Sequence, residues 1–425
     1  MKKIGYKPKR KLAVREQALG TAACLALYRV LSFVPLPFVE KGYLKAAVEG
    51  STSLSFLDAL TGGSLGDMSF MALGIGPWIT ASIVLQLLGA AFPKLAEQGR
   101  DADGRRKRKL MTLALSGILA LFTASGLAWR LYREGAVTGG AWHMALPVLC
   151  MVLGTGILSG MAWLIDERLF GNGTSLILTA GILSSYAGDA VSVAERLSYG
   201  HGAFASAVLC ALAACGAAAL SGYALFLLSC EKRLPVIYQR QAGKGVKAPG
   251  SLPLKMLPGG ILPVVFASTV ATLPGILGAL LRWDAGWLAV FDMGQWLDPG
   301  KPWASVGLLL YLALIVAFGQ FCQMLYVDLA DVAKQLSDAG GTVPGIRPGK
   351  PTAEHIRRQS RRLVLLGGLL LSILAAVPVA VSQASGMSNL SFFGTGVLIV
   401  AGALDEAWKE WTAGKQGNAY VKGIF

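Results

Sequence analysis

The sequence predicts an all-α polytopic membrane protein with ten transmembrane helices, and three observations lead to this fold class. The 425-residue chain is 54% hydrophobic and only 15% charged, whereas soluble domains carry about 25% charged residues. Its apolar residues gather in blocks of about 18 or more, the length that crosses the roughly 30 Å hydrocarbon core of a bilayer. Its basic residues alternate between dense and sparse connecting segments.

Ten apolar blocks follow one another along the chain. They are continuously apolar rather than alternating, which fits helices and not barrel strands. The first block follows a basic head, as in a signal peptide, but it is longer than a signal peptide and nine further blocks follow it. The predicted spans are 17–38, 70–91, 110–129, 144–165, 174–190, 204–230, 259–281, 304–327, 363–381 and 389–404.

The distribution of Lys and Arg predicts the orientation of these spans. The net charge is +15, and with the N-terminus inside, the inner segments hold 31 Lys and Arg residues against 7 in the outer segments. Cytoplasmic segments carry such an excess of basic residues, so we expect both termini in the cytoplasm and an even number of crossings. The remaining basic residue, Arg29, lies inside the first span and needs a partner.

The sequence predicts no catalytic site, metal or cofactor. The three histidines are scattered, and the six cysteines lie in or near apolar spans without a C-x-x-C pair, as small core residues do. The segment around Lys350 superficially resembles a phosphate loop, but Pro351 stands where Ser or Thr is required. The predicted spans hold almost no carboxylates, whereas an ion-coupled solute transporter requires one at the midplane.

Residues 51–69 are too short and too polar to span a membrane. Their pattern fits either a helix on the outer surface or a re-entrant piece buried within protein, where irregular backbone at membrane depth is tolerated. The pattern consists of apolar residues at helical spacing and then a glycine break: Phe56, Leu57, Leu60, Gly62 and Gly63.

Three inner segments are longer than connectors in a compact bundle need to be. Residues 93–109 form a basic run. Residues 230–260 show apolar alternation and then turn residues, which predicts a hairpin. Residues 328–362 predict a short amphipathic helix, a Gly/Pro-rich tip around Arg347 and a further helix with Thr352 as its N-cap. Their length favours a docking role in the cytosol.

Several spans combine helix-breaking residues with polar side chains. Such polar residues do not face lipid, and for any single hydroxyl the simpler interpretation is helix–helix packing. The second span begins with Gly74, Gly76 and Pro77, and the seventh contains Pro263 and Pro274. The polar residues concerned are Thr80, Ser82 and Gln86 in the second span and Ser268 and Thr269 in the seventh.

Five linked motifs resemble the SecY family, the channel subunit of the bacterial protein translocase. The resemblance extends from about residue 17 to residue 405. The motifs are FLDALTGGSLGDMSFMALGIGPWITASIVLQLL (56–88), GNGTSLILTAGI (171–182), LPLKMLPGGILPVVFAS (252–268), GGTVPGIRPGKPTAEHI (340–356) and FFGTGVLIVAGALDEA (392–407).

The resemblance implies two pseudo-symmetric five-helix halves around a pore that passes unfolded secretory polypeptides or releases membrane helices sideways into lipid. The N-terminal half would cover 1–190, helix six and the cytosolic hairpin loop 191–260, and the rest of the C-terminal half 259–425. The segment 51–69 would be the re-entrant plug. A collar of branched apolar side chains resists ions by dewetting, and the resemblance assigns this pore ring to Ile75, Ile79, Ile182, Val265 and Ile399.

The resemblance also implies sites for partners. Thr80, Ser82, Gln86, Ser268 and Thr269 would line the lateral gate that receives a signal sequence. Arg233, Arg240 and Arg347 would dock the motor ATPase SecA or the ribosome, and SecE-like and SecG-like small subunits would accompany the chain in the phospholipid bilayer of the plasma membrane. Trp78 and Val265 depart from the family pattern. An accessory paralogue with a narrow cargo set is therefore the alternative, and a small-solute transporter a more distant one.

Overall fold

The computed structural model describes most of the chain, and it divides these residues into two compact units. The first unit comprises Met1–Gly42, Ser64–Gly181 and Leu404–Phe425, and the second Tyr43–Gly63 and Ile182–Ala403. The described residues are 14–39, 44, 58–92, 102–133, 135, 141–169, 171–198, 203–238, 250–281, 286–291, 296, 302–326, 329–338, 341–347, 349–385, 396–409 and 412.

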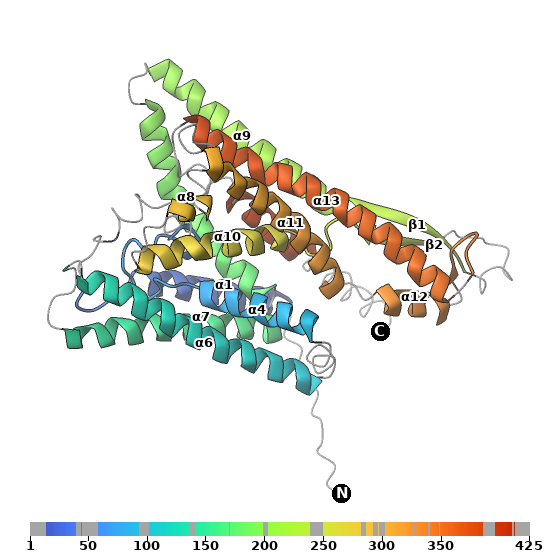
Figure 1. Ribbon diagram of the computed structural model, residues 1–425, viewed down its shortest axis with the longest axis horizontal. Coiled ribbons are helices and arrows are strands. Elements are labelled where there is room, and N and C mark those ends of the chain that lie inside the picture. Colours follow the sequence, from blue (N-terminus) through green and yellow to red (C-terminus); the bar gives the residue numbers. More distant parts are fainter. Residues whose placement is uncertain are drawn as a thin grey trace, which may run out of the picture. The chain divides into compact units, whose positions relative to one another are not determined.

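Each of the ten predicted spans overlaps one helix (Figure 1). The helices are α1 (Val14–Ser32), α4 (Gly76–Ala91), α6 (Ala102–Arg133), α7 (Ala145–Arg168), α8 (Gly173–Ser198), α9 (Ala203–Ser229), α10 (Leu262–Leu281), α11 (Ser305–Tyr326), α13 (Lys350–Ser385) and a last helix over 396–409.

Five of the described helices are long and apolar enough to cross a membrane, and they lie in α6, α7, α9, α11 and α13. The helices α4 and α10 contain shorter apolar stretches, Gly76–Gly89 and Leu262–Gly275. A helical membrane protein is thus confirmed, while the count of ten crossings and the division into halves at residue 190 remain predictions.

In the first unit, α6 packs between α4 and α7, and α1 packs on α7. The predicted second span begins with irregular backbone rather than helix, because Gly74 has a φ of 56° and Pro77 occupies the first turn of α4. Before it, Ser69 pairs with Pro35, with hydrogen bonds from Leu36 N to the Met68 carbonyl (2.9 Å) and from Phe70 N to the Val34 carbonyl (2.7 Å). This pairing anchors the entry to α4 on the end of α1.

In the second unit, α11 packs against both α10 and α13, and α9 runs beside α13 (Figure 1). Two short 3-10 helices, η3 (Gly286–Phe291) and η5 (Pro302–Ala304), precede α11. Trp296 is fully buried, and its indole donates to the Val290 carbonyl (2.7 Å). Its ring also lies 5.4 Å from the Tyr311 ring, centre to centre, so Trp296 packs onto α11.

Two of the three long segments predicted to be cytosolic, 230–260 and 328–362, pack together within the second compact unit. Their described residues form one small folded unit with the start of α13. The predicted hairpin is confirmed: β1 (Glu231–Tyr238) pairs antiparallel with β2 (Gly250–Lys255), from Glu231 opposite Lys255 to Val236 opposite Gly250. A third strand from the other segment, β3 (Gly341–Thr342), pairs with β1 and was not predicted. The predicted amphipathic helix is confirmed as α12 (Leu329–Asp338).

One predicted boundary is wrong. The sequence predicted a helix that starts with Thr352 as its N-cap, whereas α13 starts earlier, at Lys350, and runs without a break to Ser385. Thr352 lies inside the first turn, where its hydroxyl donates backward to the Arg347 carbonyl (2.8 Å). The change from charged to apolar sequence is a change of environment along one helix, and no helix-breaking residue stands at that point.

Candidate functional site

Two predicted pore-ring residues lie at the start of α4 in the first unit. Ile75 precedes the helix with φ −90° and ψ 0°, and its carbonyl accepts a hydrogen bond from Ile79 N (3.1 Å). The two side chains are therefore one helical turn apart, as predicted from their spacing, and both are buried. The break before α4 places Ile75 at the point where irregular backbone becomes helix.

The other three predicted ring residues belong to the second unit and are also buried: Ile182 on α8, Val265 on α10 and Ile399 on the last helix. Glycines bring these helices close together on either side of Ile399. A methyl group placed on Gly396 would lie 2.9 Å from Cγ2 of Ile182, and one placed on Gly402 would lie 2.8 Å from Cγ1 of Ile261. The last helix thus contacts α8 one turn before Ile399 and the entry to α10 one turn after it.

The predicted plug is described from Asp58 onward, so Phe56 and Leu57 lie outside the described residues. Residues 58–61 form a single helical turn that includes the half-buried Leu60. Gly62 and Gly63 follow with φ values of 73° and 83°, a left-handed conformation that glycine adopts without penalty. The predicted helix and its glycine break are therefore confirmed as local structure, and the plug role remains a prediction.

The three polar residues predicted for the gate on α4 are satisfied largely within their own helix. The Thr80 hydroxyl donates to the Gly76 carbonyl (3.1 Å). The Gln86 amide donates to the Ser82 hydroxyl (2.8 Å). The side-chain carbonyl oxygen of Gln86 is buried and has no hydrogen-bond partner. Among these three side chains, Gln86 is the one with a buried polar atom that lacks a hydrogen bond.

The two polar residues predicted for the gate on α10 also bond within their helix. Ser268 is fully buried and donates to the Val264 carbonyl (2.8 Å), and Thr269 donates to the Val265 carbonyl (2.8 Å). The Ser268 hydroxyl also lies 3.3 Å from the phenol of Tyr311 on α11. The structure thus places Ser268 at the contact between α10 and α11, and the gate assignment of both residues stays a prediction.

The small folded unit predicted to be cytosolic has its own hydrophobic core, which joins the hairpin, α12 and the start of α13. Alternate residues of β1 point into it, so Leu234 and Val236 are buried while Ile237 is 50% exposed. Leu252, Ile346, Ala353 and Leu363 pack against it. The buried members are Leu234, Val236, Leu254, Ala333, Leu336, Val343 and Ile356.

Two of the three predicted docking arginines lie on the surface of the elements that form this core. Arg233 is exposed on β1 and pairs with Glu231, with 2.9 Å between its Nε and a carboxylate oxygen. Arg347 is exposed directly after Ile346, which packs on the core, and Thr352 holds its carbonyl from the other side. Arg347 therefore sits on a fixed tip, and Arg240 lies outside the described residues.

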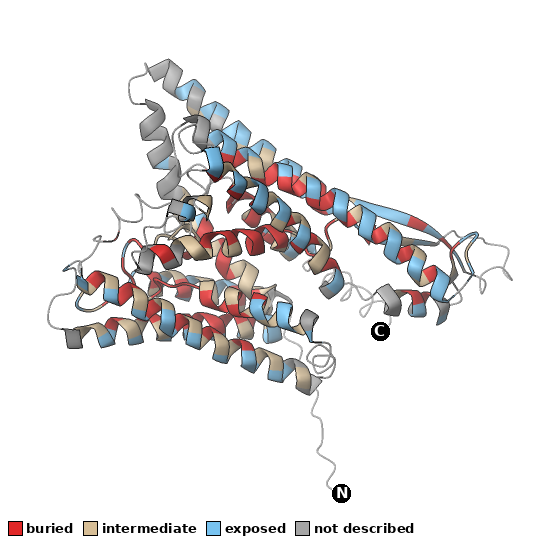
Figure 2. Ribbon diagram, viewed as in Figure 1, coloured by how far each residue is buried: buried red, intermediate tan, exposed pale blue. Residues whose placement is uncertain are grey.

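One face of α13 is exposed along the helix (pale blue in Figure 2), and its residues change from basic to apolar. Arg357, Arg358, Arg361 and Arg362 occupy it first. Within one further turn the same face becomes apolar and still exposed, with Leu365, Leu366, Leu369, Ile373 and Val377. Exposed leucines suit lipid, and exposed arginines suit the headgroup and water phases, so the character of this face changes just after Arg362.

Sequence reasoning missed a polar junction in the first unit. Asp166 at the end of α7 accepts a hydrogen bond from Gly173 N (2.8 Å) and lies 3.7 Å from the Lys109 ammonium on α6. A methyl group on Gly173 would lie 2.7 Å from the Cα of Ala162, so only glycine fits there. The Gly-Asn-Gly sequence that ends at Gly173 indicated a tight turn at this point. Nothing in the sequence indicated that Asp166 would accept the hydrogen bond from Gly173.

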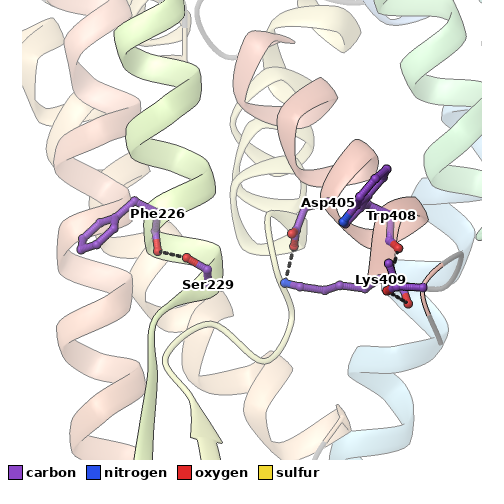
Figure 3. Close-up of polar contacts among 6 residues, drawn as sticks. Phe226, Ser229, Asp405, Trp408 and Lys409 are labelled. Carbon is purple, nitrogen blue, oxygen red and sulfur yellow. Dashed lines mark hydrogen bonds and ion pairs between the residues drawn. The ribbon is translucent and has the colours of Figure 1, made fainter. Parts of the chain in front are cut away.

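Helix ends in both units carry further local contacts. At the end of α9 the Ser229 hydroxyl donates to the Phe226 carbonyl (2.8 Å), directly before the chain becomes β1 (Figure 3). In the last helix Lys409 pairs with Asp405 one turn earlier (Figure 3). Glu406 of the same helix accepts from the Ser175 hydroxyl at the start of α8 (3.3 Å).

Arg29, the predicted charge inside the first span, lies over an aromatic ring. Its guanidinium carbon is 5.2 Å from the centre of the Phe33 ring, which is a cation–π contact. Its Nη1 atom is buried without a hydrogen-bond partner. All six cysteines are free, and only Cys322 is buried, so the expectation of small core residues holds for that one position.

Comparison with known proteins gives a consistent result over nearly the whole chain. The SecY family model matches residues 69–406. Protein translocase subunit SecY of Synechococcus elongatus is 32% identical over 419 residues, which cover 96% of this chain and 92% of that protein. The Escherichia coli K12 subunit of the same name is 31% identical over 398 residues, 91% of this chain and 88% of that protein.

Solved structures share the fold. A structure of a protein-conducting channel aligns with a TM-score of 0.71 at 16% identity, covering 96% of this chain and 94% of that chain. Sec61 in a canine ribosome–channel complex from the endoplasmic reticulum aligns with a TM-score of 0.67 at 16% identity, with the same coverage. The fold is shared with these channels, and the sequence relatives add more than 30% identity over nearly the full length. The chain belongs to the SecY family.

Proposed function

We propose that this chain is the protein-conducting channel subunit of a bacterial translocase, which passes unfolded secretory polypeptides across the plasma membrane and releases membrane helices into it. The observation that carries the proposal is SecY family membership over nearly the full length, with relatives that are translocase subunits. SecY is a channel family rather than a class of enzymes.

The five buried apolar residues at the predicted ring positions support the pore. Ile75 and Ile79 begin α4, and Ile182, Val265 and Ile399 come from three closely packed elements of the second unit. Branched apolar side chains do not hold water in a narrow constriction, so ions meet a dewetting barrier. The same side chains can yield to an extended polypeptide because they form no hydrogen bonds that must be broken.

The folded cytosolic unit supports docking of a driving partner. Arg347 on its fixed tip and Arg233 on β1 offer guanidinium groups, which bind carboxylates and phosphates through paired hydrogen bonds. A SecA-like motor and the ribosome both suit this chemistry, and one structural neighbour is a channel bound to a ribosome. SecE-like and SecG-like small subunits complete the proposed assembly.

The exposed face of α13 and the distribution of Lys and Arg support the proposed orientation. The change from basic to apolar residues after Arg362 is what a membrane boundary at that point would produce, with the hairpin, α12 and the start of α13 on the side of the inner segments that are rich in Lys and Arg. Basic segments remain on the cytoplasmic side. Both termini then lie in the cytoplasm, with the chain spanning the bacterial plasma membrane several times.

Substitution of the ring tests the pore directly. The full chain, purified with its small subunits and reconstituted in vesicles, is compared with Ile79→Asp, Ile399→Asp and a deletion of residues 56–68. A charge wets the constriction, so each aspartate variant should leak ions well above the wild type, and Ile79→Leu should not. An ion leak unchanged in the aspartate and deletion variants, with secretion also unchanged, contradicts the pore assignment.

The departures at Trp78 and Val265 from the family pattern favour a second candidate, an accessory channel with a narrow cargo set. Competition between several signal-bearing polypeptides for transport into the same vesicles separates the two. A general channel transports all of them at similar rates, and an accessory channel transports one group alone.

A further inference from the structure

A hydrogen bond joins the plug helix, the helical turn over residues 58–61, to α8 inside the second unit. The hydroxyl of Ser185 on α8 donates to the carbonyl of Ala59, 126 positions earlier in the chain, at 3.2 Å. We propose that Ser185 is a positioning residue that holds the plug helix in its resting place. This inference rests on the proposed function, because it names the contact that keeps the proposed channel closed.

The bond differs from the one that most hydroxyls inside the described helices make. Thr179, one and a half turns earlier on α8, donates to the carbonyl four residues before it, and so do Thr80, Ser268 and Thr269 in other helices. Such backward bonds are the default for Ser and Thr inside helices. The hydroxyl of Ser185 instead reaches a backbone atom of another segment, so its bond connects two elements rather than completing one.

The Ala59 carbonyl is available because the plug helix ends there. Gly63 N donates to the Asp58 carbonyl (3.0 Å) and Gly62 N donates to the Ala59 carbonyl (3.3 Å), which is the paired arrangement of a glycine helix end. A carbonyl oxygen has two lone pairs, and Gly62 uses one of them. The bond from Ser185 uses the other, at the end of the helical turn over residues 58–61.

Ser185 lies close to residues of the proposed pore ring, so a movement of the ring helices would change its contact with the plug. It lies three residues after the proposed ring residue Ile182 on α8. The adjacent Tyr186 is close to the last helix, since a methyl group on Gly396 would lie 2.6 Å from the Tyr186 hydroxyl oxygen. The backbone of Ser185 is therefore held by packing against the helix that carries Ile399, and a displacement of these helices acts directly on the plug contact.

The chain leaves the second unit immediately after this contact. Gly63 is the last residue of the segment Tyr43–Gly63, and Ser64 begins the next segment of the first unit. Gly62 and Gly63 both have positive φ and can rotate with little strain. Ser185 thus ties the plug helix to the unit that contains it, and the two glycines form the flexible connection beyond it.

The test uses the full chain with its small subunits in vesicles and compares Ser185→Ala, Ser185→Thr and Ser184→Ala. Ser184 is the neighbouring half-buried serine and makes no described hydrogen bond, so it is the matched control. Loss of one hydrogen bond between partly buried groups should raise the resting ion leak by about fivefold in Ser185→Ala. Ser185→Thr keeps the hydroxyl and should restore the wild-type leak, and Ser184→Ala should leave it unchanged.

A second measurement does not depend on transport. In a variant whose six native cysteines are replaced by alanine, Leu60→Cys reports the position of the plug through its rate of reaction with a water-soluble maleimide. Adding Ser185→Ala should raise this rate by a similar factor, and adding Ser184→Ala should not. If wild-type vesicles transport no polypeptide while the labelling responds as expected, the proposed function fails and the contact stands.

Two results overturn the inference. The first is equal leak and equal labelling in Ser185→Ala and Ser184→Ala, which would mean that the bond does not hold the plug. The second is a Ser185→Thr variant that behaves like Ser185→Ala, which would mean that the hydroxyl is not the group that acts.

Discussion

Ile356 provides a sharp test of the small folded unit predicted to be cytosolic, because it is fully buried in the core that joins the hairpin, α12 and α13. Ile356→Ala removes three carbon atoms from this core. At about 0.8 kcal/mol for each buried carbon, the loss is roughly 2.4 kcal/mol, and isoleucine-to-alanine changes in cores cost about 2–5 kcal/mol once the cavity is included. Ile237→Ala deletes the same atoms from a side chain that is 50% exposed, so it should change stability by no more than about 0.5 kcal/mol.

Limited trypsin digestion of the chain in vesicles measures this difference. Cleavage of a transiently opened segment follows its equilibrium population, and each 1.4 kcal/mol changes that population tenfold. Ile356→Ala should therefore increase cleavage after Lys232, Lys255 and Lys334 by about 50-fold, whereas Ile237→Ala should change it by about twofold or less. Equal cleavage in the two variants would refute the view that the two long segments share one core.

Further predictions concern the junction in the first unit and the tip that carries Arg347. Gly173→Ala places a methyl group against the backbone of Ala162 and should cost about 1–3 kcal/mol of stability, measured as a lower thermal unfolding midpoint. Gly160→Ala on α7 meets no atom within 4 Å, and an equal fall in that control would contradict the packing argument. Thr352→Val removes the hydrogen bond to the Arg347 carbonyl and should weaken binding of the cytosolic partner by about 2–10-fold. Thr352→Ser should restore that affinity, and a serine variant as weak as the valine variant would show that the bond is irrelevant.

The helices were predictable because each is apolar in sequence over many turns, and a pattern of that length is still recognisable when its ends are uncertain. The boundary at Thr352 was wrong for a physical reason. A helix ends where its backbone bonds end, and the sequence from Lys350 to Leu365 changes in charge without containing a residue that stops a helix. The strand β3 was missed because two residues, Gly341 and Thr342, are too few to show alternation.

For the candidate site, too, some features could be anticipated from the sequence and others could not. The burial of the residues at the ring positions and the glycine break at Gly62 and Gly63 could be anticipated because linked motifs of the SecY family contain these residues, and their roles in a ring and a plug stay predictions. Contacts between distant segments were not accessible, since the bond from Ser185 to Ala59 and the approach of Asp166 to Lys109 exist only after folding. Neither pair has a spacing or a residue pattern that distinguishes it from the many other serines and carboxylates in the chain.

The central claim, that this chain conducts polypeptides, is tested most directly by transport into vesicles that contain the chain and its small subunits. A signal-bearing unfolded polypeptide is supplied from outside with an ATP-driven motor, and the fraction protected from added protease is measured. The account predicts protection that requires the signal, the motor and ATP, and that Arg347→Glu lowers at least tenfold. Two results together would contradict the account. The polypeptide would remain unprotected whichever motor or ribosome is added, and the vesicles would take up a small solute in a saturable manner without any motor.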